Sequence, residues 1–196
     1  MRLFAAVLPP EDVTDALAAE VAELRKLPGA DRLRWTGRPG WHFTLAFYGE
    51  VPEETVPELE SRLAKAARRT EPFALALRGG GRFGGGKALW TGADGDVRAL
   101  GLLAGRAMAA ARKAGVAGAA GADTGEHRPY KAHLTLARGR DGVDVRPQVE
   151  ALRAFGSRSW TVDGIVLVRS RLPRSGVPGE QPRYEPVARW ALGGAG

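Results

Sequence analysis

The sequence lacks several features that commonly place a protein in a class. None of its 196 residues is cysteine, which excludes disulfides and zinc sites built on cysteine. No run of about 18 apolar residues occurs, so we expect no membrane-spanning helix. The short apolar start is followed by Pro9, Pro10 and acidic residues, which makes a poor signal peptide, and we therefore expect a cytoplasmic protein.

A basic tail is also absent, although the chain is basic overall. Lysine and arginine together number 29 against 22 for aspartate and glutamate, but the basic residues are dispersed and form no long block. The formal net charge of +7 favours a polyanionic partner such as nucleic acid. A composition rich in alanine, glycine and arginine produces the same charge without such a partner, so the charge has only modest weight.

Predicted strands and helices alternate along the chain. A buried strand is predicted over 2–8 and a helix over 10–29. Further helices are predicted over 52–69, 96–115 and 145–156, and further extended segments over 33–51, 72–79, 87–92, 130–138, 159–172 and 184–192. The small-residue segment 116–129, which contains His127, is predicted to be a loop. Because the alternation is not strictly strand–helix–strand, it predicts an α+β fold.

The tetrapeptide His-x-Thr-Leu occurs twice in a chain that has only three histidines. It reads HFTL at 42–45 and HLTL at 133–136, each time after a predicted helix and loop and before another predicted helix. A single copy is more often structural, whereas two copies that use two of the three histidines indicate function. The corresponding places of the two copies also predict a pseudo-duplicated fold of two lobes.

Strand geometry predicts which side chains of each motif lie together. Residues two apart on a strand point to the same face, so His42 and Thr44 share one face, and His133 and Thr135 share another. The alternation puts the apolar neighbours on the opposite faces: Phe43, Leu45, Phe47, Leu134 and Leu136. If the two lobes face each other across a cleft, the cleft holds two imidazoles and two hydroxyls.

This set of side chains suits a phosphodiester substrate. In-line displacement at phosphorus needs a base for the attacking oxygen and an acid for the leaving oxygen. Imidazole titrates near neutral pH and can serve in either role. Hydroxyl groups can donate hydrogen bonds to the non-bridging phosphate oxygens, where negative charge must be held. The motifs therefore predict acid–base catalysis on a phosphate ester.

The paired segments HFTLAFYGEV and RPYKAHLTLAR resemble the two signature motifs of the two-histidine (2H) phosphoesterases. Within that superfamily the chain resembles the RNA 2′,3′-cyclic phosphodiesterases, also called 2′-5′ RNA ligases. The resemblance includes the opening RLFAAVLPPEDV, LRW, ALWTG and the close VDGIVLVRSRL…YEPV. One departure is Ala132, which stands where the family usually has proline before the second motif.

The resemblance implies a fold, a reaction and a set of roles. Residues 1–196 would form one bilobal domain, with two pseudo-symmetric antiparallel sheets and outer helices around a central cleft. His42 would be the proton donor and His133 the proton acceptor, with Thr44 and Thr135 binding phosphate. The expected activity is hydrolysis of an RNA or nucleoside 2′,3′-cyclic phosphate to a 2′-phosphomonoester, without metal or cofactor, with reversible 2′-5′ RNA ligation as a further expectation. We expect a monomer with no membrane partner.

Arg138, which closes the second motif, is a weaker candidate for phosphate binding. Strand alternation points its side chain away from His133, so a phosphate role needs a β-bulge or a strand end nearby. A surface arginine with no role fits the sequence about as well.

Three other classes of protein would each explain some features of the sequence. GRFGGGKA (81–88) is close to a phosphate-binding P-loop, but Ala88 replaces the required hydroxyl and a strand follows, so we predict a hairpin loop. A metal hydrolase would need ligands beyond two histidines, and no HExxH motif occurs. A non-catalytic RNA-binding module would use aromatic stacking platforms, for which the candidates are Trp35, Trp41, Tyr130 and Trp160.

Overall fold

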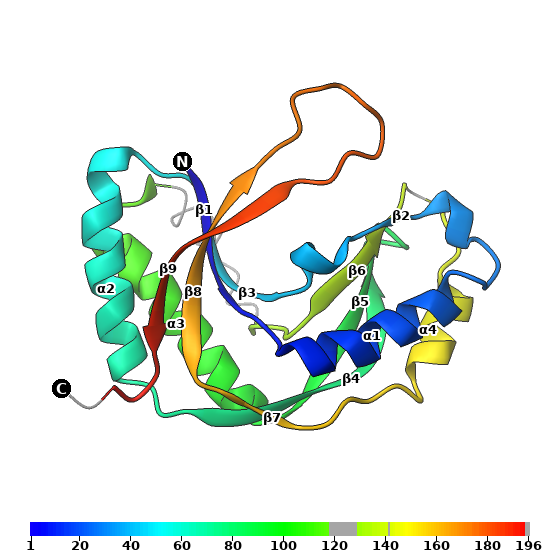
Figure 1. Ribbon diagram of the computed structural model, residues 1–196, viewed down its shortest axis with the longest axis horizontal. Coiled ribbons are helices and arrows are strands. Elements are labelled where there is room, and N and C mark those ends of the chain that lie inside the picture. Colours follow the sequence, from blue (N-terminus) through cyan, green and yellow to red (C-terminus); the bar gives the residue numbers. More distant parts are fainter. Residues whose placement is uncertain (118–128, 141, 195–196) are drawn as a thin grey trace.

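The computed structural model describes residues 1–117, 129–140 and 142–194. His127 and most of the predicted loop 116–129 lie outside the described residues. The described chain forms two antiparallel sheets with helices on their outer sides, which confirms the α+β prediction (Figure 1). Each helix in these ranges is too short or too polar to cross a membrane.

The first sheet has the strand order β3-β1-β8-β9 and the second has the order β2-β6-β5-β4-β7. The first sheet consists of β1 (Arg2–Val7), β3 (Phe43–Glu50), β8 (Gly164–Arg171) and β9 (Arg183–Ala191). The second consists of β2 (Arg34–Trp35), β4 (Phe73–Phe83), β5 (Ala88–Gly95), β6 (Leu134–Arg138) and β7 (Trp160–Val162). The sheets are therefore not the two halves of the sequence, because the chain passes between them several times.

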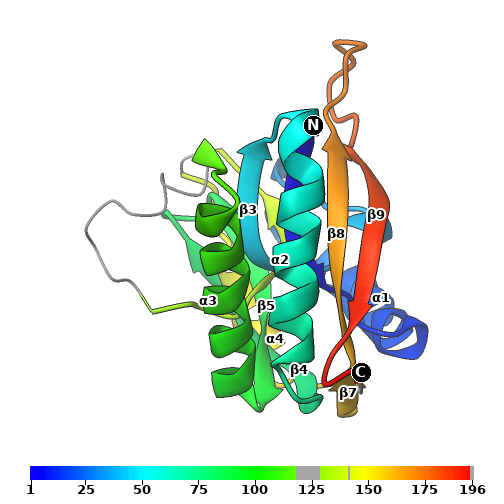
Figure 2. The same cartoon turned by 90° about the vertical axis from the view of Figure 1, so that its left-hand side faces the viewer.

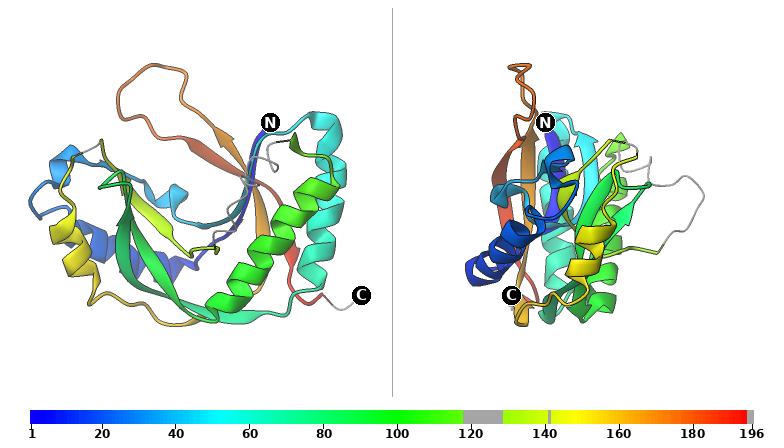
Figure 3. Two further views of the ribbon diagram at one scale, coloured as in Figure 1. Left: turned by 180° about the vertical axis from the view of Figure 1, so that it is seen from behind. Right: turned by 90° about the vertical axis from the view of Figure 1, so that its right-hand side faces the viewer.

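The helices divide between the two sheets. They are α1 (Glu11–Leu24), α2 (Val56–Arg68), α3 (Val97–Lys113) and α4 (Arg146–Leu152), with short 3₁₀ helices η1 (Ala30–Arg32), η2 (Arg38–Gly40) and η3 (Glu53–Thr55). Helices α2 and α3 pack side by side on the first sheet (Figure 2). Helix α4 packs on β4, and α1 lies on the same side of the molecule (Figure 3). One cluster of buried apolar side chains includes residues of both sheets and all four helices.

Helix boundaries follow the local chemistry, with some differences from the predictions. Helix α1 begins after Pro10 with two acidic residues, as predicted, but ends at Leu24 rather than near 29, because the chain turns before Gly29, whose φ is 83°. The side chain of Asp96 caps α3 by accepting a hydrogen bond from the Ala99 amide at 3.0 Å. Helix α4 is shorter than the predicted 145–156.

The segment 159–172 is predicted as one strand but forms two. Strand β7 pairs with β4 in the second sheet, whereas β8 pairs with β1 and β9 in the first. The break lies at Asp163, and a Cβ at the next residue, Gly164, would approach the Trp190 carbonyl oxygen at 3.1 Å. The local signal for this break is the turn-type dipeptide Asp163-Gly164, which stands between the two buried apolar runs and which the prediction of one continuous strand overlooks.

Both motif strands contain a β-bulge at the same residue of the tetrapeptide. In β3 the pairing with β1 passes from Ala46 directly to Thr44, which leaves Leu45 as the extra residue. In β6 the pairing with β5 passes from Ala137 directly to Thr135, which leaves Leu136 as the extra residue. Because a bulge adds one residue to a strand, it reverses the facing of the side chains beyond it.

The bulge at Leu45 corrects the predicted facing of Phe47. Phe47 does not share a face with Phe43: its side chain is 45% exposed, and it lies opposite Phe4 in the neighbouring strand. Tyr48 is buried in its place, and its hydroxyl donates a hydrogen bond to the Ala107 carbonyl of α3. A strict alternation from Phe43 onward is therefore wrong after the bulge.

Candidate active site

The two motif histidines stand at equivalent places, each directly before the strand that carries the rest of its motif. His42 precedes β3, and His133 precedes β6, which begins at Leu134 rather than at residue 130 as predicted. We call the face of each sheet that is turned away from its helices the inner face. The two sheets curl so that their inner faces are turned toward each other (Figures 1 and 3).

His42 is wedged between two aromatic rings of the first sheet. Its ring stacks on Phe4 of β1 with centroids 4.7 Å apart, and it meets Tyr184 of β9 edge-on at 5.5 Å. Tyr184 reaches this place across Gly40, where a Cβ would lie 3.1 Å from the tyrosine ring. Burial and, to a smaller extent, electrostatic interaction with His133 together lower the pKa of His42 from 6.5 to about 4. The second effect requires the two imidazoles to be near each other.

His133 has a polar contact that determines which ring nitrogen carries the proton. Its Nδ1 lies 2.8 Å from the backbone carbonyl oxygen of Lys131. A carbonyl oxygen can only accept, so Nδ1 must donate, and in the neutral ring Nε2 holds the free lone pair. Residue Lys131 also places its ammonium 4.7 Å from the centre of the Trp90 ring. His133 meets Phe83 edge-on at 4.9 Å.

The Gly-rich segment positions the aromatic rings around His133. It forms the β4–β5 hairpin, with β4 extending to Phe83, rather than a long loop. The Trp90 ring lies against Gly81, where a Cβ would be 2.5 Å from the ring, so only glycine fits there. The tryptophan can then lie flat on the sheet, and Phe83 and Trp90 contact each other with centroids 5.2 Å apart. The predicted hairpin is confirmed, and its strand delivers Phe83 to His133.

Thr44 and Thr135 lie on the inner faces with hydroxyl groups that are available to a ligand. Thr44 is opposite Ala6, and Thr135 is opposite Trp90, so each shares a face with the aromatic contacts of its histidine. Both side chains are half-buried. Within the described ranges, neither hydroxyl takes part in a hydrogen bond. Two imidazoles and two free hydroxyls therefore face the same region, as the sequence predicts.

Tyr130 joins the two motifs. Its hydroxyl, three residues before His133, donates a hydrogen bond of 2.7 Å to the backbone carbonyl oxygen of Thr44. Burial raises the pKa of Tyr130 well above its ordinary value, so the hydroxyl keeps its proton and remains a donor. The sequence does not predict this link, because nothing in the local pattern relates Tyr130 to a strand of the other sheet.

Arg138 shares the inner face with Thr135 because of the bulge at Leu136. It lies opposite both Ala88, which is on the same face of β5 as Trp90, and Arg34 of β2. The bulge that a phosphate role requires is therefore present. Arg34, which the sequence does not single out, stands beside Arg138 on the same face. Burial raises the pKa of Tyr184, and Arg138 opposes that effect, which places the guanidinium near the ring beside His42.

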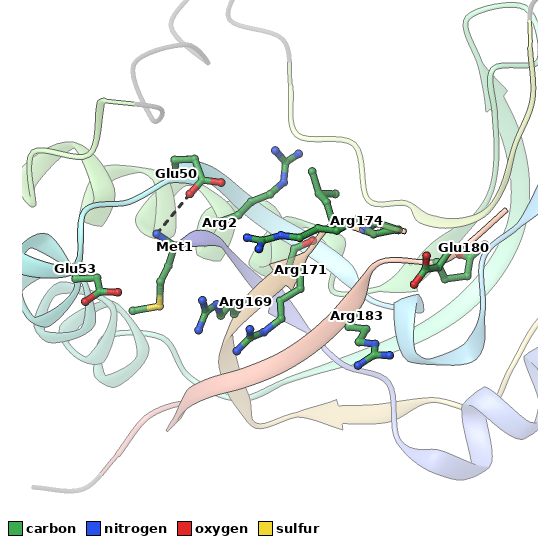
Figure 4. Close-up of a pocket in the computed structure, with 13 residues that line it drawn as sticks. Met1, Arg2, Glu50, Glu53, Arg169, Arg171, Arg174, Glu180 and Arg183 are labelled. Carbon is green, nitrogen blue, oxygen red and sulfur yellow. Dashed lines mark ion pairs between the residues drawn. The ribbon is translucent and has the colours of Figure 1, made fainter. Parts of the chain in front are cut away.

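A basic cavity of about 620 Å³ opens beyond Phe4 at the end of the first sheet (Figure 4). Its arginines come from β1, β8, β9 and the connection between β8 and β9: Arg2, Arg169, Arg171, Arg174 and Arg183. Three carboxylates, Glu50, Glu53 and Glu180, line the same cavity, and Arg171 pairs with Glu185 at 3.0 Å. The charge there is partly neutralised within the protein.

The structure also bears on the other classes of protein. After the turn at 84–87 the chain continues as β5, so the segment is not a P-loop, which would lead into a helix. Among the described residues, no group of three histidine, aspartate or glutamate side chains could hold a metal ion. The expected stacking platforms are packed: Trp41 and Trp160 are each 6% exposed, and the Trp35 indole donates to the Ala30 carbonyl.

Comparison with known proteins agrees with this geometry. The family described as LigT like phosphoesterase matches residues 7–90 and 105–178. An RNA 2′,3′-cyclic phosphodiesterase of Thermus thermophilus is 34% identical over 202 aligned residues, which cover 99% of this chain and 91% of that protein. The chain belongs to the LigT-like phosphoesterase family.

Solved structures give the same result for the fold. The protein TT0787 of Thermus thermophilus superposes with a TM-score of 0.75 at 30% identity over 99% of both chains. E. coli LigT in complex with 3′-AMP superposes with a TM-score of 0.72 at 25% identity, over 97% of this chain and 96% of that one. The arrangement of antiparallel sheets and helices is therefore that of the LigT structures.

Proposed function

We propose that this protein hydrolyses the 2′,3′-cyclic phosphate at the end of an RNA, or on a nucleoside, to a 2′-phosphomonoester. The observation that carries this proposal is the paired motif: two histidines near enough that His133 contributes to the lowered pKa of His42, each with a free threonine hydroxyl on the inner face of its own sheet. Membership of the family, and the chain's similarity to the RNA 2′,3′-cyclic phosphodiesterase of T. thermophilus, support the substrate class. Both motifs come from one chain, so a monomer can hold the whole site.

His133 is the base in this mechanism. Its Nδ1 is occupied by the Lys131 carbonyl, so Nε2 is the nitrogen that takes a proton from water. The water oxygen attacks phosphorus in line with the bond to O3′. The resulting imidazolium is stabilised through its Nδ1–H bond to the carbonyl oxygen.

His42 is the acid that protonates O3′ as the P–O3′ bond breaks. In the free protein its lowered pKa favours the neutral ring, and the negative charge of a bound phosphate favours the protonated one. A buried imidazolium is also a stronger acid than an exposed one, which suits an alkoxide leaving group. One proton moves from water to His133 and one from His42 to O3′, and exchange with solvent restores both rings.

Thr44, Thr135 and Arg138 hold the phosphate during this exchange. The two hydroxyls donate to the non-bridging oxygens, and the Arg138 guanidinium balances their charge from the same inner face. No step needs a metal or a cofactor. Ligation to a 2′-5′ linkage follows the same steps when the 5′-hydroxyl of a second RNA replaces water.

The test is the identity of the product. We expect adenosine 2′,3′-cyclic phosphate, incubated with the protein in a chelator, to give adenosine 2′-phosphate, identified by chromatography against authentic 2′- and 3′-phosphates. A mainly 3′-phosphate product would reverse the orientation of the substrate between His42 and His133. Absence of hydrolysis, with chelator or with added divalent ions, would overturn the proposed activity itself.

A further inference from the structure

A second basic cavity, of about 870 Å³, lies beside the candidate active site. Its walls come from η1 and β2, from the end of β6 and the residues after it, and from the tip of the β8–β9 connection, where Pro178 and Gly179 stand. That connection rises from the first sheet toward β2 of the second (Figure 1). The volume is within the range of about 300–1,000 Å³ typical of small-ligand sites.

Among the residues that the structure describes, the lining of this cavity includes no acidic side chain and four arginines: Arg32, Arg34, Arg138 and Arg140. All four are exposed, and none has an ion-pair partner within the described ranges. The cavity in Figure 4 differs, because three glutamates line it together with its arginines. Within the described part of the chain no carboxylate offsets the charge of the second cavity, which favours an anionic ligand, and guanidinium groups match the geometry of phosphate oxygens.

The position of the cavity relates this ligand to the reaction. Arg34 and Arg138 lie opposite each other on neighbouring strands, where like charges destabilise a sheet unless an anion binds between them. Arg138 is three residues along β6 from Thr135, a span of roughly 10 Å at the usual rise of a strand. An anion in the cavity is therefore close enough to belong to the same molecule as the reacting phosphate.

We propose that this cavity binds the backbone phosphates of the nucleotides that precede the cyclic end of an RNA. The inference rests on the proposed function and makes it more specific, because it selects RNA 3′ ends over mononucleotides. A basic groove that follows the backbone is the usual way to hold a single strand without reading its sequence.

The experiment compares two substrates and two double variants. Arg32→Ala/Arg140→Ala removes two charges from the cavity, whereas Arg68→Ala/Arg112→Ala removes two exposed charges from the ends of α2 and α3 and serves as the matched control. The substrates are adenosine 2′,3′-cyclic phosphate and a tetranucleotide that ends in the same cyclic nucleotide. For each protein, kcat/KM is measured with both substrates at several salt concentrations.

We expect the cavity variant to lose about tenfold more kcat/KM on the tetranucleotide than on the mononucleotide. In a plot of log kcat/KM against log salt concentration for the tetranucleotide, the slope of the cavity variant should be shallower by about 0.7 for each backbone phosphate that it no longer binds. The control double variant should keep the wild-type rate and slope. Equal losses on the two substrates, or equal losses in the two variants, would overturn the proposal. Arg140→Ala alone provides a second variant if the double one unfolds.

Failure of this proposal can be distinguished from failure of the proposed function. If the wild-type protein hydrolyses both substrates with the same kcat/KM and the same salt dependence, the activity stands and the phosphate subsite does not. If it hydrolyses neither, the activity fails, and binding of a tetranucleotide with a 2′-phosphate end, measured by fluorescence anisotropy, decides the subsite. Wild-type binding no tighter than that of the Arg32→Ala/Arg140→Ala variant would then overturn it.

Discussion

The two His-x-Thr-Leu motifs lead into the strands β3 and β6, and within the tetrapeptide the two local structures are alike. Each histidine stands just before its strand, and each threonine faces inward with a free hydroxyl. The last leucine of each motif, Leu45 or Leu136, is the extra residue of a β-bulge. Beyond the tetrapeptide the surroundings differ. His42 is stacked on Phe4, and its pKa falls to about 4, whereas His133 is tied through Nδ1 to a backbone carbonyl.

In the proposed mechanism, this difference means that the motif supplies the two imidazoles and that the neighbouring residues determine which one acts as acid and which as base. Phe4 and Tyr184 come from strands at the two ends of the chain, and Lys131 comes from the segment that leads into β6. A duplicated site with identical surroundings would give two equivalent imidazoles, which could not act as acid and base in a defined order. The predictions below test how far the two halves of the site are alike.

The largest effect is expected from the histidines. His42→Ala or His133→Ala should lower kcat/KM on the cyclic phosphate by about 10²–10⁴-fold, because each removes a proton-transfer group. The kcat/KM of the double variant should be little lower than that of the less active single variant, since the two histidines act as a unit. Steady-state kinetics on adenosine 2′,3′-cyclic phosphate measures both statements.

A substrate with a p-nitrophenolate leaving group separates the two histidines. Its leaving oxygen needs no proton, so His42→Ala should lose far less on this substrate than on the cyclic phosphate, while His133→Ala loses as much on both. The opposite pattern would exchange the roles of acid and base between the two strands.

The threonines come next. Thr44→Val or Thr135→Val keeps the shape of the side chain and removes one hydrogen bond to a charged phosphate, worth about 1.5–3 kcal/mol. We expect kcat/KM to fall by roughly 10–150-fold in either variant. Thr161→Val, at an exposed position of β7, is the control and should match the wild type. A loss confined to one threonine would show that only one strand holds the phosphate.

Acid stability should reveal the buried environment of His42. Its folded pKa of about 4 lies below the ordinary 6.5, so between these values the unfolded chain binds a proton that the native state does not. The free energy of unfolding should therefore fall as pH falls through this window, by about 2 kcal/mol between pH 6.5 and 4.5. Urea denaturation at both pH values, on wild type and His42→Gln, isolates this contribution; the same decrease in both proteins would contradict it.

The paired motifs, the order of most elements and the hairpin at the Gly-rich segment could be predicted from the sequence, because motif identity, periodicity and turn residues are local. The inward facing of Arg138 could not, because it depends on a bulge at Leu136 that no local pattern marks. The neighbours of His42 could not be predicted either: Tyr184 lies far along the chain, and its contact depends on how β9 pairs with β8. Arg34 becomes a candidate only when β2 pairs with β6.

The smallest predicted effect concerns Tyr130, which connects the two motif strands. Tyr130→Phe removes a donor from the Thr44 carbonyl oxygen, and the loss of one such hydrogen bond costs about 1 kcal/mol. For a chain of this length we expect the melting temperature to fall by about 2–4 °C. Tyr48→Phe is the matched control, because it also removes one hydrogen bond between a tyrosine hydroxyl and a backbone carbonyl oxygen. Tyr48 lies on β3, as Thr44 does, but its hydroxyl donates to the Ala107 carbonyl of α3, away from the site.

The two variants should therefore lose similar stability and differ in activity. Tyr130 lies three residues before His133 and holds the Thr44 backbone, so its loss loosens the base relative to the phosphate-binding hydroxyl. A displacement of this kind affects the transition state more than substrate binding, so kcat should fall by several-fold, on the order of the same 1 kcal/mol, with KM little changed. Calorimetry and kinetics on both variants measure the two effects separately. If Tyr48→Phe lost as much kcat as Tyr130→Phe, general loosening of β3 would explain both results, and Tyr130 would have no special part in aligning the two halves of the site.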